Sequence, residues 1–137
     1  MTTAIHPQGW VPARGYANGI VASGRQCFIA GQIGWDPRTT TPTFPPTFVG
    51  QFELALTNVL EVLRAAGGRP DQLCRLTIYV TDKREYLGAL KDLGAVWKKL
   101  LGRHYPAIAL VQVVALVEDL AKVEIEATAM LDEQATP

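Results

Sequence analysis

The chain has 137 residues, of which 48% are hydrophobic and 19% are charged, and its 13 basic residues balance its 13 acidic ones. This composition predicts one folded domain and excludes an intrinsically disordered chain. The balanced charge argues against a nucleic-acid partner, and no apolar run reaches the roughly 18 residues that a membrane-spanning helix needs. No targeting pattern is visible at the N-terminus, so the cytoplasm is the expected location.

Two short apolar runs open the chain, at residues 19–24 and 26–33. Their link at Ser23-Gly24-Arg25 has the length of a tight turn, which predicts a β-hairpin. The next segment, GWDPRTTTPTFPPT, is too rich in proline and threonine for a regular element. It is expected to form an ordered surface loop.

A helix is predicted to begin at Phe48, with Thr47 as its N-cap and the pair Gly67-Gly68 as its stop signal. The apolar positions behind this prediction recur at helical spacing; they are Phe52, Leu56, Val59 and Leu63.

A strand is predicted at residues 73–81, a second helix at 84–101, and two closing strands at 107–116 and 121–131. The apolar face of the second helix consists of Tyr86, Leu90, Leu93, Trp97 and Leu100. The resulting order, ββαβαββ, indicates an α+β fold in which two helices cover one face of a mixed sheet.

The strand predicted at residues 107–116 is apolar on both faces. Two helices can cover only one face of a sheet, so the other face needs a second cover. In a chain of this size, the expected cover is another copy of the same chain.

Glu124 and Glu126 lie two residues apart in the last predicted strand, so their side chains share a face. An ordinary solvated strand face is one explanation, and a carboxylate that points into a pocket is the other. Cys27 and Cys74 have no metal-ligand spacing and are expected to be buried free thiols. The chain shows no metal or cofactor motif, and none is expected to bind.

Five short motifs, taken in order, resemble the reactive intermediate deaminase family, called RidA or YjgF and also endoribonuclease L-PSP. They are GYANGI, AGQIGWDP, IYVTD, YPA and VEIEATA. The resemblance covers about residues 14–130 and implies a chorismate-mutase-like fold, a homotrimer with a central barrel, and small-molecule clefts between subunits. Residues 1–137 then form one domain, with 1–13 and 132–137 flexible or peripheral.

The resemblance also implies a cofactor-independent hydrolase that converts reactive enamines or imines to keto acids and ammonia. Glu124 is the expected catalytic residue, because a carboxylate can hold the attacking water and shuttle its proton. For Glu126 a structural polar contact is expected. The resemblance implies a substrate cleft lined by Tyr16, Gly31, Gln32, Ile108 and Leu110.

One position departs from the family pattern. In the deaminating branch an arginine follows Pro-Ala and binds the substrate carboxylate, whereas Ile108 follows Pro106-Ala107 here. A buried carboxylate without a cation would cost on the order of several kcal/mol. The small amino acid intermediate 2-aminoacrylate is therefore not the expected substrate.

Two interpretations of the cleft remain open. The first is an enamine or imine hydrolase with a larger, less charged substrate, or with a cation supplied by Arg14 or Arg103 in place of the missing arginine. A surface role for these two arginines is the simpler expectation. The second is a non-catalytic trimer that binds small apolar metabolites in the same clefts.

Overall fold

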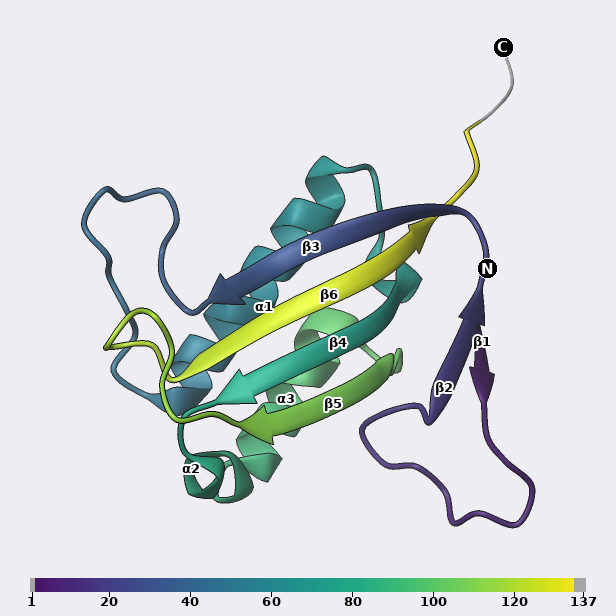
Figure 1. Ribbon diagram of the computed structural model, residues 1–137, viewed down its shortest axis with the longest axis horizontal. Helices are drawn as coiled ribbons and strands as arrows, with labels where there is room; N and C mark the ends of the chain where they lie inside the picture. The colour runs from purple at the N-terminus through teal and green to yellow at the C-terminus, as the bar shows by residue number, and fades with distance from the viewer. Residues whose placement is uncertain (1, 135–137) are drawn as a thin grey trace.

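The computed structural model describes residues 2–134, which form two sheets and the helices that cover one face of the larger sheet (Figure 1). The larger sheet contains β3 (Arg25–Ile33), β6 (Val123–Leu131), β4 (Leu73–Val80) and β5 (Ala107–Gln112), in that order. β4 and β5 run parallel, and the other neighbours are antiparallel. The predicted mixed sheet with helices on one face is confirmed.

The first helix, α1 (Phe48–Ala65), begins and ends where the sequence indicated. The hydroxyl of Thr47 accepts the N–H of Gly50 at 3.0 Å, which caps the start. At the other end, the N–H of Gly68 donates to Leu63, and Gly67 adopts a positive φ of 86°. This is a Schellman C-cap. A short 3-10 helix, η1 (Pro70–Gln72), then leads into β4.

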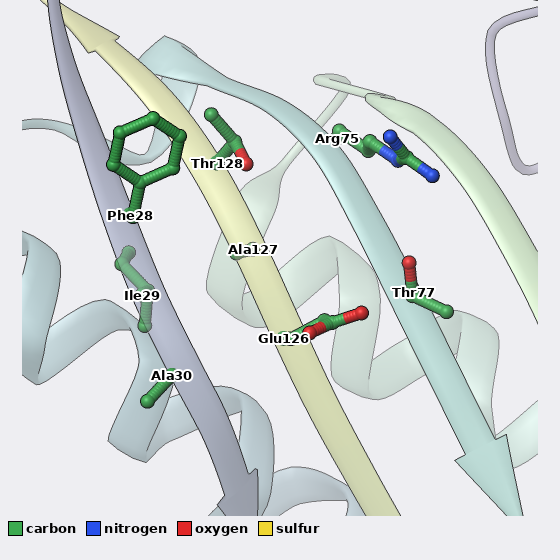
Figure 2. A pocket seen from close by; sticks show the side chains of 8 residues that line it. All are labelled: Phe28, Ile29, Ala30, Arg75, Thr77, Glu126, Ala127 and Thr128. Atoms are coloured by element: carbon green, nitrogen blue, oxygen red, sulfur yellow. The ribbon is translucent and has the colours of Figure 1, made fainter.

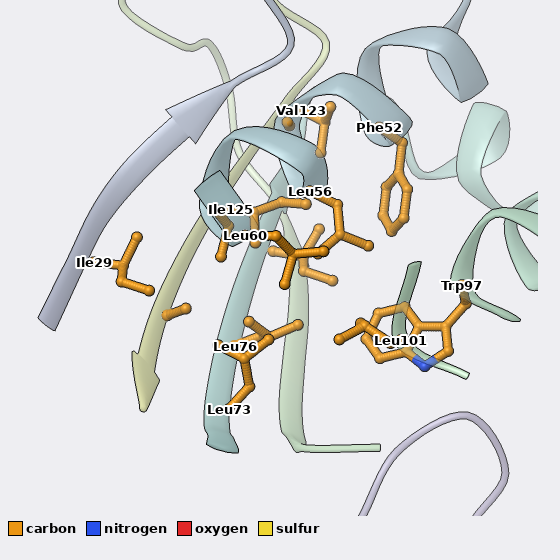
Figure 3. Packing of buried hydrophobic residues seen from close by; sticks show 14 of the residues in the cluster. Ile29, Phe52, Leu56, Leu60, Leu73, Leu76, Trp97, Leu101, Val123 and Ile125 are labelled. Carbon is orange, nitrogen blue, oxygen red and sulfur yellow. The ribbon is translucent and has the colours of Figure 1, made fainter. Parts of the chain in front are cut away.

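The core lies between the sheet and the helices α1 and α3 (Leu90–Leu101), as Figure 3 shows. Alternate residues of β4 and β6 point into it, so the sheet has one buried face. Its largest fully buried side chains include Leu56, Leu60, Leu63, Leu73, Leu76 and Ile125. No helix within the described residues is both long and apolar enough to cross a membrane.

The single helix predicted at residues 84–101 is wrong in one respect, because the structure divides it into α2 (Lys83–Leu87) and α3. The carboxylate of Asp82 accepts the N–H of Arg84 and caps the start of α2. Gly88 is the C-cap residue at which α2 ends. The apolar spacing continues across this break, which explains why periodicity alone did not detect it. Leu90 is left 51% exposed at the start of α3.

The predicted hairpin is also wrong. β2 (Gly19–Ala22) pairs with β1 (Thr2–Ile5), a strand that the sequence did not indicate, while β3 pairs with β6. The chain turns at Gly24, with a φ of 134°, where a Cβ would lie 3.1 Å from the carbonyl carbon of Leu131. The glycine signal correctly located the turn. The strand pairing differs because the nine-residue β3 can pair along its whole length with the nine-residue β6, but not with the four-residue β2.

The predicted strand at 107–116 is shorter than expected, since β5 ends at Gln112. β5 lies at the edge of the sheet and pairs only with β4, which ends at Val80. The side-chain carbonyl of Gln112 accepts the N–H of Lys83 at 2.8 Å. Of the predicted terminal tails, residues 2–5 form β1, while residues 1 and 135–137 lie outside the described residues.

The buried Gln51 of α1 holds two loops in place. Its amide nitrogen donates to the carbonyls of Pro45 and Leu120 at 3.1 and 3.0 Å. Its amide oxygen accepts the N–H of Lys122 at 2.8 Å. Gln51 therefore fixes the segment that leads into β6, the strand that carries Glu124.

Candidate functional site

Tyr16 is held beside the start of β5 by the backbone of the loop that follows β1. The N–H of Ala17 donates to the carbonyl of Pro106 at 2.9 Å, and Ala17 forms an isolated parallel bridge with Ala107. Pro106 is fully buried. This contact brings the GYANGI and YPA motifs together, so that Tyr16 and Ile108 line one pocket.

That pocket, which we call the α3 pocket, has a volume of about 320 Å³ and opens between α3, β5 and the Tyr16 loop. Small-molecule sites commonly have volumes of about 300–1,000 Å³ and mostly apolar walls. Leu110 lies on the same face of β5 as Ile108, two residues further on. The apolar walls include Phe52, Ile78, Leu90, Leu93, Trp97, Ile108 and Leu110.

Trp97 and Tyr105 form an aromatic wall of the pocket. Their rings are stacked, with centroids 5.9 Å apart and planes inclined by 1°. The indole N–H donates to the carbonyl of His104 at 3.0 Å. His104 Nε2 in turn lies 2.7 Å from the carbonyl of Leu73 and must carry a proton, because a carbonyl can only accept. The wall is thereby anchored to the start of β4.

Arg14 and Arg103, the two alternative cations, line different pockets. Arg14 lines the α3 pocket next to Tyr16. Arg103 lines a neighbouring hollow of about 490 Å³, together with His6 and residues of the β1–β2 sheet. Neither arginine forms an ion pair with another described residue. Arg14 is therefore the cation available to a ligand in the α3 pocket.

Glu124 lies on the other face of the sheet, against a bulge in β3. The register between β3 and β6 shifts between Ile29 and Gln32. At the bulge, a Cβ built on Gly31 would lie 2.9 Å from Cδ of Glu124, so the carboxylate occupies space that only glycine leaves free. Within residues 2–134 this carboxylate forms no hydrogen bond and no ion pair. It is free to accept a hydrogen bond from water.

Gln32 lies next to this pair, at the end of the bulge. Its side-chain N–H donates to the carbonyl of Ala30 at 3.1 Å. The side chain therefore satisfies the carbonyl of Ala30, a backbone group of the bulge that places Gly31 beside the Glu124 side chain.

Glu126 makes the polar contact that the sequence led us to expect. It accepts the hydroxyl of Tyr79 at 2.7 Å. This hydrogen bond raises the pKa of Tyr79, and partial desolvation and the negative charges of Glu126 and Glu124 act in the same direction. Tyr79 is therefore a neutral donor near neutral pH.

The open face of the sheet carries a shallow hollow of about 440 Å³ beside this pair, lined by both polar and apolar residues. Figure 2 shows Phe28 from β3, Glu126 and Thr128 from β6, and Arg75 and Thr77 from β4 on this face. Phe28 is 75% exposed and Val111 of β5 is 45% exposed. The face that the helices leave open thus mixes exposed apolar and charged side chains.

The expected site residues therefore fall into two groups within one chain. Ile108 and Leu110 pair in register with the core residues Leu76 and Ile78, and so face the helices with Tyr16 nearby. Glu124 pairs in register with Tyr79, which follows Ile78 and points the opposite way. The α3 pocket and the Glu124–Gly31 pair lie on opposite faces of the sheet.

The described residues contain no cluster of three or more His, Cys, Asp or Glu that could hold a metal ion. Cys27 and Cys74 are free and half-buried. Burial raises the pKa of the Cys74 thiol, which favours the unreactive protonated form.

The sequence did not single out Gly94 of α3 as a site residue, although this glycine lines the α3 pocket. The helical spacing placed Leu93 and Trp97 on the apolar face of the helix and gave no indication that they line a pocket. A signal was present: glycine is unfavourable inside a helix, and Gly94 lies between Leu90 and Trp97 on the apolar face.

The fold and the two groups of residues define a small chorismate-mutase-like α+β domain with a ligand-sized pocket. The family model described as Endoribonuclease L-PSP matches residues 8–131. A 2-iminobutanoate/2-iminopropanoate deaminase from Capra hircus is 35% identical over 106 residues, covering 77% of this chain and 73% of the relative. Protein DfrA of Myxococcus xanthus is 35% identical over 129 residues, covering 93% of this chain and 94% of that protein.

Solved structures agree with the sequence relatives. The Rid family protein YyfB from Yersinia pestis has a TM-score of 0.80 and 30% identity, covering 95% of this chain and 98% of the other. Escherichia coli TdcF, solved with bound serine, has a TM-score of 0.67 and 32% identity, covering 95% and 99%. The chain belongs to the RidA/YjgF family of reactive intermediate deaminases.

Proposed function

We propose that the protein is a cofactor-independent hydrolytic deaminase of a reactive enamine or imine, with 2-aminoacrylate a poor substrate. Relatives named as 2-iminobutanoate/2-iminopropanoate deaminases support the reaction class. The observation that carries the proposal is the Glu124 carboxylate, which lies against Gly31 without a competing cation or hydrogen-bond donor among the described residues.

Hydrolysis of an imine needs little beyond a positioned water and a proton acceptor. An enamine first tautomerises to the iminium, whose carbon is electrophilic. Water held by Glu124 adds to this carbon, the carboxylate takes the water's proton, and the proton passes to nitrogen. The C–N bond then breaks, leaving a carbonyl compound and ammonia. No oxidant, reductant or cofactor is consumed.

We propose further that the protein is a homotrimer and that each site joins the α3 pocket of one subunit to Glu124 and Gly31 of its neighbour. The two groups lie on opposite faces of the sheet, so a single chain cannot present both to one small molecule. The open sheet face, with Phe28 and Val111 exposed, is available to pack against other copies as the wall of a central barrel.

Ile108 is the reason to expect a substrate other than 2-aminoacrylate. Its side chain and Leu110 present an apolar wall to the pocket and offer no hydrogen-bond donor. A small substrate whose carboxylate was placed against this wall would lose its hydration without compensation. A larger apolar substrate would gain from the same contact.

Ammonia release from a panel of imines tests the proposal. The imines are generated in situ by an amino acid oxidase, and the wild-type protein is compared with Glu124→Gln, which keeps the side-chain shape but removes the base. We expect faster ammonia release with the wild-type protein and loss of that acceleration in the variant, with unchanged circular dichroism. Acceleration that survives Glu124→Gln in full would overturn the assignment of Glu124.

The second candidate function is a trimeric binder that holds small apolar metabolites in the same clefts without reacting with them. The apolar character of the pocket at Ile108 favours it. Binding of apolar ligands without ammonia release from any imine would identify this function.

The family description also names an endoribonuclease. We propose no ribonuclease activity for this chain and no nucleic-acid partner, because its 13 basic and 13 acidic residues leave no net positive charge. Proteins that bind RNA usually present a basic surface to the phosphates.

A further inference from the structure

The α3 pocket has features that point to a specific class of substrate. Gly94 lies in the interior of α3, where glycine is less favourable than alanine because it gains no side-chain contact and loses more backbone freedom. Its φ is not positive, so the backbone there does not require glycine. A Cβ built on Gly94 would meet no atom within 4 Å.

Gly94 therefore borders empty space and keeps that space part of the pocket. Leu90, one helical turn earlier, and Trp97, about one turn later, line the same pocket. Together with Leu93 they form an apolar surface suited to a flat or branched hydrocarbon group. A substrate with only a methyl side chain would leave most of the 320 Å³ unfilled.

Arg14 adds one positive charge to a pocket whose other lining side chains are aliphatic or aromatic. It lines the pocket beside Tyr16 and is exposed, and within the part of the chain that the structure describes it forms no ion pair. A guanidinium binds a carboxylate through two parallel hydrogen bonds, which fixes the orientation of the bound molecule. The pocket thus offers an apolar surface and a carboxylate anchor.

We infer that the substrate is the imine of a 2-keto acid with a bulky apolar side chain, aromatic or branched, whose side chain fills the α3 pocket beside Gly94 and whose carboxylate binds Arg14. This inference rests on the proposed deaminase function. The reaction balances as R–CH₂–C(=NH₂⁺)–COO⁻ plus water giving R–CH₂–CO–COO⁻ plus NH₄⁺. The C=N bond is hydrolysed, and nothing is oxidised or reduced.

The kinetic test compares imines generated from phenylalanine, leucine and alanine by an amino acid oxidase. We expect kcat/KM to favour the phenylalanine and leucine imines over the alanine imine. Gly94→Leu fills the pocket with a better helix former, so it should fold at least as well and lower the phenylalanine-to-alanine preference by about 10-fold or more. An unchanged preference in Gly94→Leu would overturn the assignment of the pocket.

The charge is tested with Arg14→Ala and its control Arg103→Ala, an arginine that lines the other hollow. Arg14→Ala should lower kcat/KM for all three imines by roughly 10- to 100-fold, the value of a hydrogen bond to a charged group. Arg103→Ala should match the wild type. Equal losses in both variants would overturn the role of Arg14.

Calorimetric binding of two products, phenylpyruvate and pyruvate, separates this inference from the proposed function. We expect phenylpyruvate to bind more tightly, and Gly94→Leu and Arg14→Ala each to weaken it. Such binding without turnover of any imine would leave the pocket assignment standing and refute the deaminase proposal. Turnover without a preference for phenylpyruvate over pyruvate would support deamination and refute the inference.

Discussion

The Glu124 side chain of β6 lies against the backbone of Gly31 in β3, two residues before its register partner Ile33, and a Cβ on Gly31 would lie 2.9 Å from Cδ of Glu124. The glycine belongs to a bulge, a feature that often redirects a side chain beside an active site. The bulge and the missing side chain together leave the Glu124 carboxylate in a position where it accepts no hydrogen bond from the described residues.

Gly31→Ala should therefore displace the carboxylate without unfolding the protein. Gly31 is exposed and its φ is not positive, so the backbone accepts alanine. We expect imine hydrolysis to fall roughly 10- to 100-fold, as small misplacements of a catalytic group do, with a melting temperature close to the wild type. The control Ala30→Gly changes the neighbouring residue of the bulge and should keep most activity. Full activity in Gly31→Ala would contradict the proposed role of this pair.

Gly94→Ala should raise the free energy of unfolding by about 0.5–1 kcal/mol, because alanine is favoured in a helix interior and meets no clash there. Gly67→Ala is the matched control. Gly67 has a φ of 86° at the C-cap of α1, so alanine there should destabilise the protein instead. Urea denaturation measures both values. If Gly94→Ala lowered the free energy of unfolding, other atoms of the protein would occupy the space beside Gly94 and the pocket would not be open there.

The sequence predicted much of this fold because the signals were local. Thr47 and the pair Gly67-Gly68 fixed the ends of α1, and period-2 patterns located β4 and β6. The partner of β2 was not predictable in this way. Its pairing with β1 joins residues 14 to 20 positions apart across an irregular loop, and the turn residues Ser23-Gly24-Arg25 are the same whether or not the strands that flank them pair.

The residues of the candidate site were predictable from the sequence, but their division between the two faces of the sheet was not. Motifs located Tyr16, Gly31, Ile108 and Glu124, yet which face each strand presents to the helices depends on tertiary packing. Gly94 was overlooked because a single glycine in an apolar helix carries no catalytic chemistry. Its importance appears only when the space beside it is found to be empty.

Ile108→Arg should raise the turnover of 2-aminoacrylate, which the wild type hydrolyses poorly. The position lies near the start of an edge strand and is only partly buried, so the longer side chain can extend toward the mouth of the pocket. We expect a gain of about 2–4 kcal/mol in transition-state binding for small carboxylates, measured as kcat/KM. Ile108→Lys, a point charge without the bidentate fork, should gain less. Strong 2-aminoacrylate hydrolysis by the wild type would contradict this prediction, and aggregation of Ile108→Arg would place Ile108 in the packed core.

The Tyr79–Glu126 hydrogen bond should make stability depend on pH at the alkaline end. The folded state raises the pKa of Tyr79, so the contact stabilises the protein fully below the ordinary tyrosine pKa of about 10. The stabilisation is lost as pH rises through the folded-state value. Tyr79→Phe should therefore have a lower free energy of unfolding than the wild type at about pH 8, and the two values should become equal at higher pH. A difference that is the same at both pH values would show that the hydrogen bond contributes nothing.

Subunit mixing tests whether the α3 pocket of one subunit works with Glu124 of another. Glu124→Gln and the pocket-blocking Gly94→Trp, each inactive alone, are unfolded together and refolded as an equimolar mixture, and ammonia release is measured. Random assembly would give about one quarter of the sites an intact pocket and an intact Glu124, so we predict recovery of about one quarter of wild-type activity. A mixture that stays as inactive as the separate variants would contradict a site formed between subunits.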